Sequence, residues 1–285
     1  MPKESLWRIS FFAGALIILA LLESLHPRRK RIQTRKKRWF VNLAMTAIST
    51  GFIRFLVPLA PVAAALYAGE KGWGFLNRVN LPFFLEFAIA FIIFDLLIFL
   101  QHAMFHAIPL FWRLHMMHHT DLDIDLTTGI RFHPLEILIS TGIKIAVVFS
   151  LGAPASAVLV FEIVLNACAM FNHSNLHLPF WMDRMIRILI VTPDMHRVHH
   201  SVIIHETNSN FGFNFSFWDR LFGTYHARPM RGHTEMTIGL SHIRNPERLG
   251  LWNLLIQPFT EDPGAYPMSR NKSRSRKIPK RTGST

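Results

Sequence analysis

The sequence predicts an all-α integral-membrane protein, a bundle of about four to five helices that span or re-enter the bilayer, with a histidine-rich helical cap on the cytoplasmic side. Half of the 285 residues are hydrophobic and only 17% are charged, less charge than a soluble domain of this size normally carries. Apolar runs long enough to cross a bilayer recur along the chain. Short histidine motifs with the spacing of a helix face lie beside these runs.

The N-terminal part contains two apolar runs. Residues 6–25 are predicted to be a membrane anchor rather than a signal peptide, because the basic region before them is weak and no small-residue cleavage site follows. Residues 39–68 form a second, longer run. Pro58 and Pro61 interrupt it, so we expect a kinked or broken helix there.

A third span is predicted over residues 82–101, with Pro82 at its first position. Intramembrane carboxylates are costly and usually face the protein interior. Asp95 lies seven residues before His102, about two helical turns away on the same face. It is expected either to orient a metal ligand or to make a contact between helices.

The last membrane element is predicted to be a helical hairpin. Residues 135–152 and 154–172 are two apolar runs that meet at Gly152-Ala153-Pro154. After the hairpin the chain is polar and apolar in alternation, and its basic, Ser- and Pro-containing end over 270–281 is expected to be disordered.

The net charge of +13 is concentrated in two stretches, because 28–38 and 270–281 hold 15 of the 31 Lys and Arg residues. Beside apolar spans, such stretches indicate the cytoplasmic side and attraction to anionic lipid rather than a nucleic-acid partner. With 28–38 in the cytoplasm, counting spans brings every histidine motif to that same side. The single Cys168 excludes a disulfide framework and a thiolate metal cage.

Four motifs, two of spacing HxxxH and two of spacing HxxHH, hold ten histidines. Residues three or four apart share a helix face, so each motif can direct its imidazoles to one point. Ten imidazoles suffice for two metal ions with about five ligands each. The predicted ligands are His102, His106, His115, His118, His119, His173, His177, His196, His199 and His200.

The ligand type narrows the choice of metal. Without cysteine ligands a structural zinc site is not expected. The chain has no pair of Glu-x-x-His motifs of the kind that builds di-iron carboxylate bundles, and no HExxH motif of the usual zinc protease. An all-nitrogen site favours a redox metal. Zinc binds nitrogen sites more tightly than iron(II), so purified protein is expected to be open to zinc substitution.

The motifs HAMFH (102–106), HMMHH (115–119) and HRVHH (196–200), with the hairpin between them, resemble the histidine boxes of the fatty acid hydroxylase/sterol desaturase superfamily of integral-membrane di-iron oxygenases. The stretches RFHPLE (131–136) and NSNFGFNFSFWDRLFGTYH (208–226) also resemble segments of that family.

The resemblance implies an oxygen-dependent oxidoreductase that hydroxylates or desaturates a lipid, such as a sterol or a fatty acid. It implies two irons held by the ten histidines, and electrons from a separate reductase, ferredoxin or cytochrome. The similar region is a catalytic domain over 82–230, between an N-terminal anchor over 1–81 and a C-terminal segment over 231–285. The compact chain without an organelle signal favours a bacterial inner membrane.

Several polar residues near the motifs have other expected roles. His133 is expected at the surface or beside a ligand, and Asn172 and Asn175 either hydrogen-bond a ligand or cap a helix. Four histidines lack paired spacing and are expected to be ordinary residues: His205, His226, His233 and His242.

Two functions of other classes stay open. A metal transporter or metal-binding membrane protein would use histidines along an ion path, but here they gather at one face. A metal-dependent lipid hydrolase would need a general base, for which Asp121, Asp123 and Asp125 are available, although a solvated acidic loop is favoured for them. A joint requirement for oxygen and a reductant would separate the oxygenase from both.

Overall fold

The computed structural model describes residues 2–57 and 59–269, and over these residues it is helical with no β-strand. The elements are α1 (Pro2–Leu25), α2 (Arg35–Leu56), α3 (Pro61–Lys71), η1 (Leu76–Arg78), α4 (Phe83–Ala107), α5 (Pro109–His119), η2 (Thr128–Ile130), α6 (Pro134–Leu151), α7 (Ala155–His173), α8 (Phe180–Ile186), α9 (Pro193–His199), α10 (Ile204–Thr207), α11 (Phe217–Leu221), α12 (Gly232–Glu235), η3 (Pro246–Leu249) and α13 (Leu251–Thr260). The predicted tail over 270–281 lies outside the described residues.

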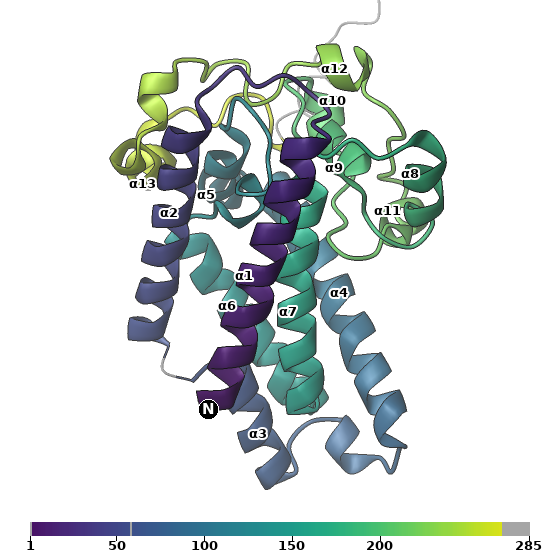
Figure 1. The fold of residues 1–285 in the computed structure, drawn as a ribbon. Coiled ribbons are helices and arrows are strands. Elements are labelled where there is room, and N and C mark those ends of the chain that lie inside the picture. The colour runs from purple at the N-terminus through teal and green to yellow at the C-terminus, as the bar shows by residue number, and fades with distance from the viewer. Residues whose placement is uncertain (1, 58, 270–285) are drawn as a thin grey trace, which may run out of the picture.

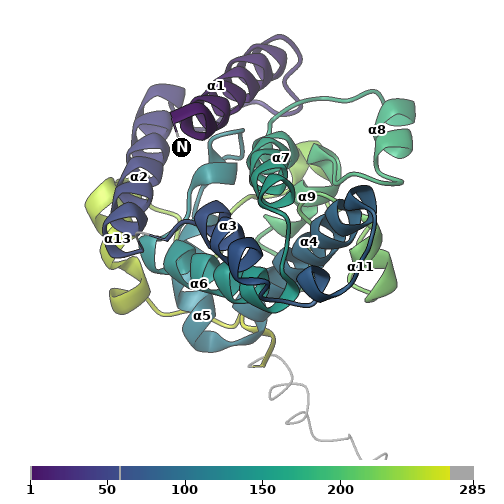
Figure 2. The ribbon, with the colours of Figure 1, turned by 90° about the horizontal axis from the view of Figure 1, so that it is seen from below.

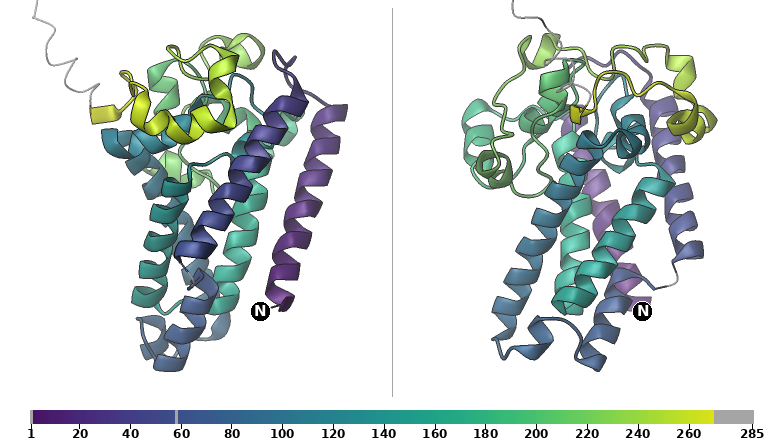
Figure 3. Two further views of the ribbon diagram at one scale, coloured as in Figure 1. Left: turned by 90° about the vertical axis from the view of Figure 1, so that its left-hand side faces the viewer. Right: turned by 180° about the vertical axis from the view of Figure 1, so that it is seen from behind.

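The molecule has a long helical bundle and a cap at one end. Helices α1, α2, α3, α4, α6 and α7 form the bundle, and the shorter helices α5 and α8 to α13 gather at its upper end (Figure 1). Viewed from below, α3 lies among α4, α6 and α7, whereas α1 and α2 lie toward the edge (Figure 2). The side views show α1 and α2 running along the outside of the bundle (Figure 3), where α1 packs against α7 and α2 against α6.

Five segments of the bundle are long and apolar enough to cross a membrane, which confirms the predicted fold class. They are Glu4–Leu25, Arg35–Arg78, Phe83–Ala107, Pro134–Leu151 and Ala155–His173. Large apolar side chains such as Trp7 and Phe84 are 57% and 67% exposed on the outer surface, as expected of helices that face lipid.

The second span is broken as the prolines predict. Helix α2 ends at Leu56, and α3 begins with Pro61 at a first-turn position, where the missing N–H of proline leaves no helical hydrogen bond unmade. Pro58 itself lies outside the described residues.

The first two histidine motifs lie on two consecutive helices, 102–106 on α4 and 115–119 on α5. Helix α4 ends at Ala107, and α5 begins with Pro109 in its first turn, so the chain changes direction between the motifs 102–106 and 115–119. In the core of the bundle, Phe94 of α4 stacks on Phe161 of α7 with ring centroids 5.3 Å apart. This packing fixes α4 beside α7 and brings the upper ends of both helices together below the cap.

The predicted hairpin of α6 and α7 is present. Gly152 follows α6 with a φ of +71°, a left-handed conformation that glycine adopts without strain. A Cβ there would also lie 2.6 Å from Nδ2 of Asn77, so both the backbone angle and the space require glycine.

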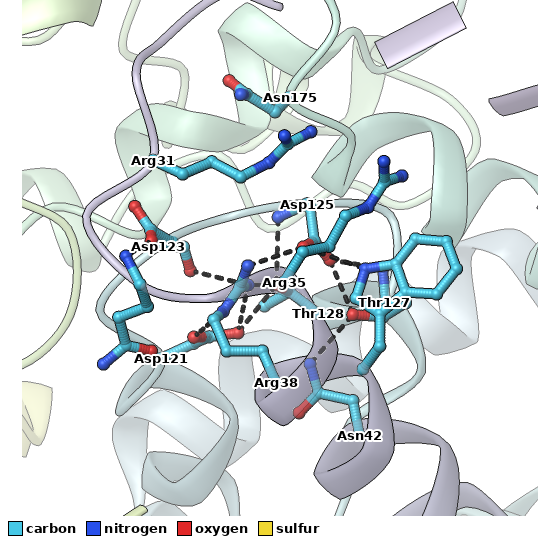
Figure 4. Close-up of polar contacts among 12 residues, drawn as sticks. Arg31, Arg35, Arg38, Asn42, Asp121, Asp123, Asp125, Thr127, Thr128 and Asn175 are labelled. Atoms are coloured by element: carbon cyan, nitrogen blue, oxygen red, sulfur yellow. Dashed lines mark hydrogen bonds and ion pairs between the residues drawn. The ribbon is translucent and has the colours of Figure 1, made fainter. Parts of the chain in front are cut away.

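The basic stretch 28–38 was expected only to lie beside the membrane and attract anionic lipid. In the structure its arginines also pair with carboxylates of the folded cap. Arg38 is 5% exposed and donates to both carboxylate oxygens of Asp121 at 2.9 and 2.8 Å, and to Asp125 at 2.6 Å (Figure 4). Arg28 pairs with Asp194 in the same two-pronged way at 3.1 Å. The three lysines of the stretch stay exposed: Lys30, Lys36 and Lys37.

The expectation of a solvated acidic loop is wrong for Asp121, Asp123 and Asp125, all of which are buried. Asp123 accepts hydrogen bonds from the backbone N–H groups of Ile32 and Gln33. Burial alone would raise the pKa of Asp121, but the guanidinium groups of Arg38 and Arg131 lower it to about 2. The acidic residues therefore join the N-terminal segment to the cap.

Candidate metal centre

The structure brings nine of the ten predicted ligands into two buried groups. One group contains His102, His106, His115, His119 and His199. The other contains His118, His173, His196 and His200. In each group every residue offers one ligand atom, and these atoms lie within 4.8 Å of one another.

The second group already has the spacing of a coordination shell. Nε2 of His173 lies 3.0 Å from Nε2 of His118 and 3.1 Å from Nε2 of His196. Metal–nitrogen bonds of about 2.0–2.1 Å place neighbouring ligand nitrogens about 3.0–3.4 Å apart. These imidazoles therefore stand where one ion would hold them.

The first group is a set of nitrogens without partners. Nε2 of each of its five histidines is buried and makes no hydrogen bond within the described part of the chain. Buried polar atoms are nearly always paired, so five converging orphans need a common partner. A metal ion is the partner that fits, because in a neutral imidazole the nitrogen without a proton offers a lone pair to a metal.

Hydrogen bonds to the opposite nitrogens hold these rings in place. Nδ1 of His102 lies 2.8 Å from the carbonyl of Phe211, and Nδ1 of His199 lies 2.7 Å from that of Ser209. A carbonyl only accepts, so each Nδ1 carries the proton and each Nε2 is left as the lone-pair atom.

Electrostatics keep the cap histidines neutral. Burial lowers the pKa well below the ordinary 6.5, and the neighbouring imidazoles lower it further. This holds for His118, His119, His196, His199 and His200. Neutral imidazole is the form that binds metal.

His177 is the predicted ligand that the structure does not bring to either group. Helix α7 ends at His173 and the chain then runs extended from Ser174, so the HxxxH spacing of 173–177 does not lie on a helix. The backbone N–H of His177 donates to the carbonyl of His26, and its side chain is exposed. The second group therefore has four histidines where five were expected.

Other residues near the motifs have structural contacts. His133 caps α6 by accepting from the N–H of Leu135, and its Nε2 lies 3.1 Å from the carbonyl of Leu255. Asp95 accepts from the indole N–H of Trp218 at 2.8 Å, which makes it a contact between α4 and α11 rather than a partner of His102.

Of the two asparagines, Asn172 has one of the expected roles and Asn175 has neither. Asn172 lies beside Nδ1 of His173 through its Oδ1, at 2.5 Å, and so contacts one of the grouped histidines. Asn175 exchanges hydrogen bonds with the backbone of Arg29 and ties the basic stretch to the end of α7.

Two polar contacts of the groups were missed from the sequence. Glu136 Oε1 lies 2.7 Å from Nδ1 of His115, and Asn208 Oδ1 lies 3.1 Å from Nδ1 of His106. Both residues stand in stretches, 131–136 and 208–226, whose resemblance was noted without a role for these side chains. The position of Glu136 at the end of RFHPLE, a stretch singled out by its resemblance, is the sequence signal that could have found it.

A cavity of about 270 Å³ opens beside the first group. His102 and His115 line one end of it, and α1, α2, α6 and α7 supply most of its walls. The cavity can therefore hold part of a ligand next to the histidines.

Comparison with known proteins places the chain in a family. The fatty acid hydroxylase profile matches residues 87–224, which include all ten predicted ligands. The chain is 26% identical to an ornithine lipid hydroxylase of Rhizobium tropici over 90% of its own length and 76% of that protein. No solved structure matches the chain.

More distant relatives are larger or share a shorter region. The chain is 25% identical to an alkylglycerol monooxygenase of Caenorhabditis elegans over 93% of its own length, and spans 51% of that protein. It is 27% identical to a cholesterol 25-hydroxylase of Rattus norvegicus over 50% of its length and 47% of that protein. From the profile match, these relatives and the histidine groups, the chain belongs to the fatty acid hydroxylase/sterol desaturase superfamily.

Proposed function

We propose that the protein is a membrane-bound di-iron monooxygenase that hydroxylates a lipid with molecular oxygen and electrons from a separate donor. Its relatives are hydroxylases and monooxygenases, so the class of reaction is an oxygen-dependent oxidation of lipid, with hydroxylation favoured over desaturation. The observation that carries the proposal is the pair of buried histidine groups, one with five converging Nε2 atoms that lack partners among the described residues and one with Nε2 atoms about 3 Å apart.

Each group would hold one iron, and the two irons would supply the activation of oxygen. His102, His106, His115, His119 and His199 would be the ligands of one. His118, His173, His196 and His200 would be the ligands of the other. Glu136 and the carbonyl of Ser209 keep Nδ1 of His115 and His199 engaged, so the rings present Nε2 without reorganisation.

The metal centre and the C-terminal segment would face the cytoplasm of a bacterial cell, across its inner membrane. The basic stretch 28–38 lies at the cap end of the bundle (Figure 1), and basic loops beside spans mark the cytoplasmic side. A C-terminal epitope tag should be protected in intact spheroplasts and accessible after lysis; accessibility in intact spheroplasts would reverse the orientation.

The proposed catalytic unit is 82–230, anchored by 1–81 and followed by 231–285. A reductase, ferredoxin or cytochrome would dock on the cytoplasmic cap and deliver electrons. Zinc can replace iron during purification, because nitrogen sites bind zinc more tightly than iron(II).

The first test is metal stoichiometry. Protein purified in detergent is stripped, loaded anaerobically with iron(II), and measured for iron per chain. About two irons per chain are expected, and the loaded protein should then consume oxygen only with both a lipid and a reductant present. One metal per chain, or turnover without oxygen and reductant, would contradict the proposal and favour a hydrolase. Binding without any turnover would favour a metal transporter.

A further inference from the structure

A third cluster of possible metal ligands lies on the cap, outside the two histidine groups. His205 and Glu206 of α10 and His226, five residues after α11, each offer one ligand atom, and these atoms lie within 4.8 Å of one another. The rings of His205 and His226 have their centroids 5.7 Å apart. Helix α10 belongs to the cap (Figure 1). Twenty-one positions separate the two histidines in the chain, and spacing along one helix therefore predicts ordinary residues at both.

The carboxylate of Glu206 is fully buried, but only one of its oxygens has a partner. Oε1 accepts from the backbone N–H of Met230 at 2.5 Å, and this hydrogen bond fixes the orientation of the carboxylate. Oε2 is buried and makes no hydrogen bond among the described residues, so neither imidazole of the cluster is bonded to it. Buried charges are normally paired or bound to a metal, because a partnerless buried carboxylate oxygen costs free energy. A cation shared with the two histidines would remove that cost.

Hydrogen bonds hold the backbone of both segments that carry the cluster. The N–H of His226 donates to Oδ1 of Asn210 at 2.8 Å, and Nδ2 of Asn210 donates to the carbonyl of His226 at 2.8 Å. In α10, the hydroxyl of Thr207 donates to the carbonyl of Ser201 at 2.5 Å. The backbone is thus held on both sides, whereas His205 is exposed and His226 is half-buried, so an ion can reach both rings from solvent.

Small movements of side chains would complete a coordination shell. Metal–ligand bonds of about 2.0–2.2 Å place neighbouring ligand atoms about 3.0–3.5 Å apart. The present separations of up to 4.8 Å would therefore have to close by about 1.5 Å. Rotation of the exposed His205 side chain supplies such a movement without any change in the backbone.

The ligand set of the cluster indicates the kind of metal. Two imidazoles and one carboxylate form a set of three protein ligands that zinc binds with water in the fourth position. Calcium and magnesium prefer shells made of oxygen ligands. Iron(II) binds nitrogen and oxygen ligands more weakly than zinc. The cluster therefore favours zinc over iron(II), calcium and magnesium.

The chain between these ligands helps to hold the buried histidine groups. Between Glu206 and His226 lie three residues that contact Nδ1 of grouped histidines, namely Asn208, Ser209 and Phe211. An ion that joins α10 to His226 would close the two ends of segment 206–226 on each other. It would thereby restrict the motion of the residues that hold the grouped rings.

We propose that His205, Glu206 and His226 form a third metal site, which takes zinc with water as the fourth ligand and clasps the two ends of segment 206–226. The site is separate from the two histidine groups and does not depend on which metal those groups hold. Because it opens to solvent, its occupancy follows the concentration of free zinc. Its role is to stiffen the segment that positions the grouped histidines.

Metal content at equilibrium tests the site. Full-length protein in detergent, with its buried groups loaded with iron, is dialysed against a series of chelator-buffered free zinc concentrations. Iron plus zinc per chain is then measured by elemental analysis. Because the two metals are summed, exchange of zinc for iron in the buried groups does not alter the result. We expect the wild type to bind one ion more than His205→Gln or His226→Gln, in which half-saturation of that ion should rise at least about tenfold.

Two further variants separate the buried ligand from the background of surface histidines. Glu206→Gln keeps an oxygen that can accept from Met230 but loses the charge, and it should also lose the additional ion. His177→Gln is the matched control, because His177 is exposed and belongs to none of the three clusters, and it should bind metal as the wild type does. Equal metal content in the wild type and all three ligand variants would overturn the proposal, as would the same loss in His177→Gln.

Hydrogen exchange tests the clasp. With zinc at about 100 times the half-saturating concentration, opening that requires release of the ion should slow by up to about 100-fold. Exchange of the backbone N–H groups over 206–226 should therefore slow in the wild type and in His177→Gln, but not in His226→Gln. Zinc binding that leaves exchange of this segment unchanged in the wild type would show a surface ion that clasps nothing, and would overturn the proposed role.

Discussion

At the scale of single residues, the proposed metal centre depends on which nitrogen of each imidazole is held by a hydrogen bond. The carbonyls of Phe211 and Ser209 engage Nδ1 of His102 and His199, and this leaves Nε2 directed at the common point. Because second contacts of this kind fix both tautomer and ring orientation, the protein can present ligands before a metal arrives.

Replacing a grouped histidine should remove metal. We expect His118→Ala and His199→Ala each to lower iron content by about one ion per chain and to abolish turnover, because a four- or five-nitrogen shell loses a ligand. His177→Ala is the matched control, since its side chain is exposed and outside both groups. Metal analysis decides, and a variant of His118 that keeps two irons and full activity would refute the assignment.

Arg38 should be a large contributor to folding stability. Arg38→Met leaves Asp125 without a guanidinium partner, and Asp121 keeps one guanidinium contact, the longer one to Arg131 at 3.8 Å. Removing one partner of a buried ion pair costs about 3–5 kcal/mol. Thermal unfolding in detergent should therefore shift strongly downward.

The control for this change is Arg248→Met. Arg248 pairs with Glu261 but is 52% exposed, so the loss should stay below about 1 kcal/mol. Equal shifts for the buried and the exposed arginine would contradict the structural role assigned to Arg38.

At the scale of elements, the second histidine group depends on a close approach between η2 and the last turn of α7. A Cβ on Gly129 would lie 2.2 Å from the carbonyl oxygen of Ala169 and 3.1 Å from Nδ1 of His173. That same carbonyl accepts from His173 at 2.7 Å. The position of His173 is therefore coupled to the space that glycine leaves.

Gly129→Ala should displace the end of α7. We expect a loss of stability of about 1–3 kcal/mol, the usual effect of overpacking, and a loss of iron from the second group first. Gly142→Ala, inside α6 with open space around its Cβ, should be neutral or slightly stabilising. Unfolding temperatures and iron content of the pair test this, and two equivalent variants would disprove the coupling.

At the scale of the whole molecule, burial of many neutral histidines makes stability depend on pH. Five cap histidines have a pKa lowered well below 6.5, so below that pH the unfolded chain takes up protons that the folded chain does not. Folding stability should therefore fall as the pH drops. The carboxylate of Asp121, with its pKa lowered from 3.8 to about 2, loses its contribution only below that window.

Metal-stripped protein should lose thermal stability steadily between pH 7 and 5.5, by up to about 1.4 kcal/mol per pH unit for each histidine involved. Iron-loaded protein should resist acid longer, because bound metal competes with protons for the same nitrogens. Thermal melts of both forms across this range are the measurement. A flat profile for the stripped protein would show that the histidines are protonated or accessible when folded.

The membrane spans and the nine grouped histidines follow from patterns within short stretches of the sequence. Apolar length, the prolines near residues 58–61 and the glycine at 152 act within a few residues of themselves, and the structure agrees with each. His177 shows the limit of this reasoning, because HxxxH spacing converges only while the helix continues, and α7 ends at His173.

The sequence by itself determined the membrane bundle and the candidate histidine ligands, because these depend on composition and on spacing along one helix, and the resemblance of its histidine motifs indicated the family. The tertiary structure alone decided which histidines share a group, which partner each Nδ1 has, and that Arg38 meets Asp121 across 83 positions. It also decided that Arg8, Lys144 and Glu162, on three helices, line one cavity. Such pairings depend on how distant elements pack, and periodicity along the chain carries no information about them.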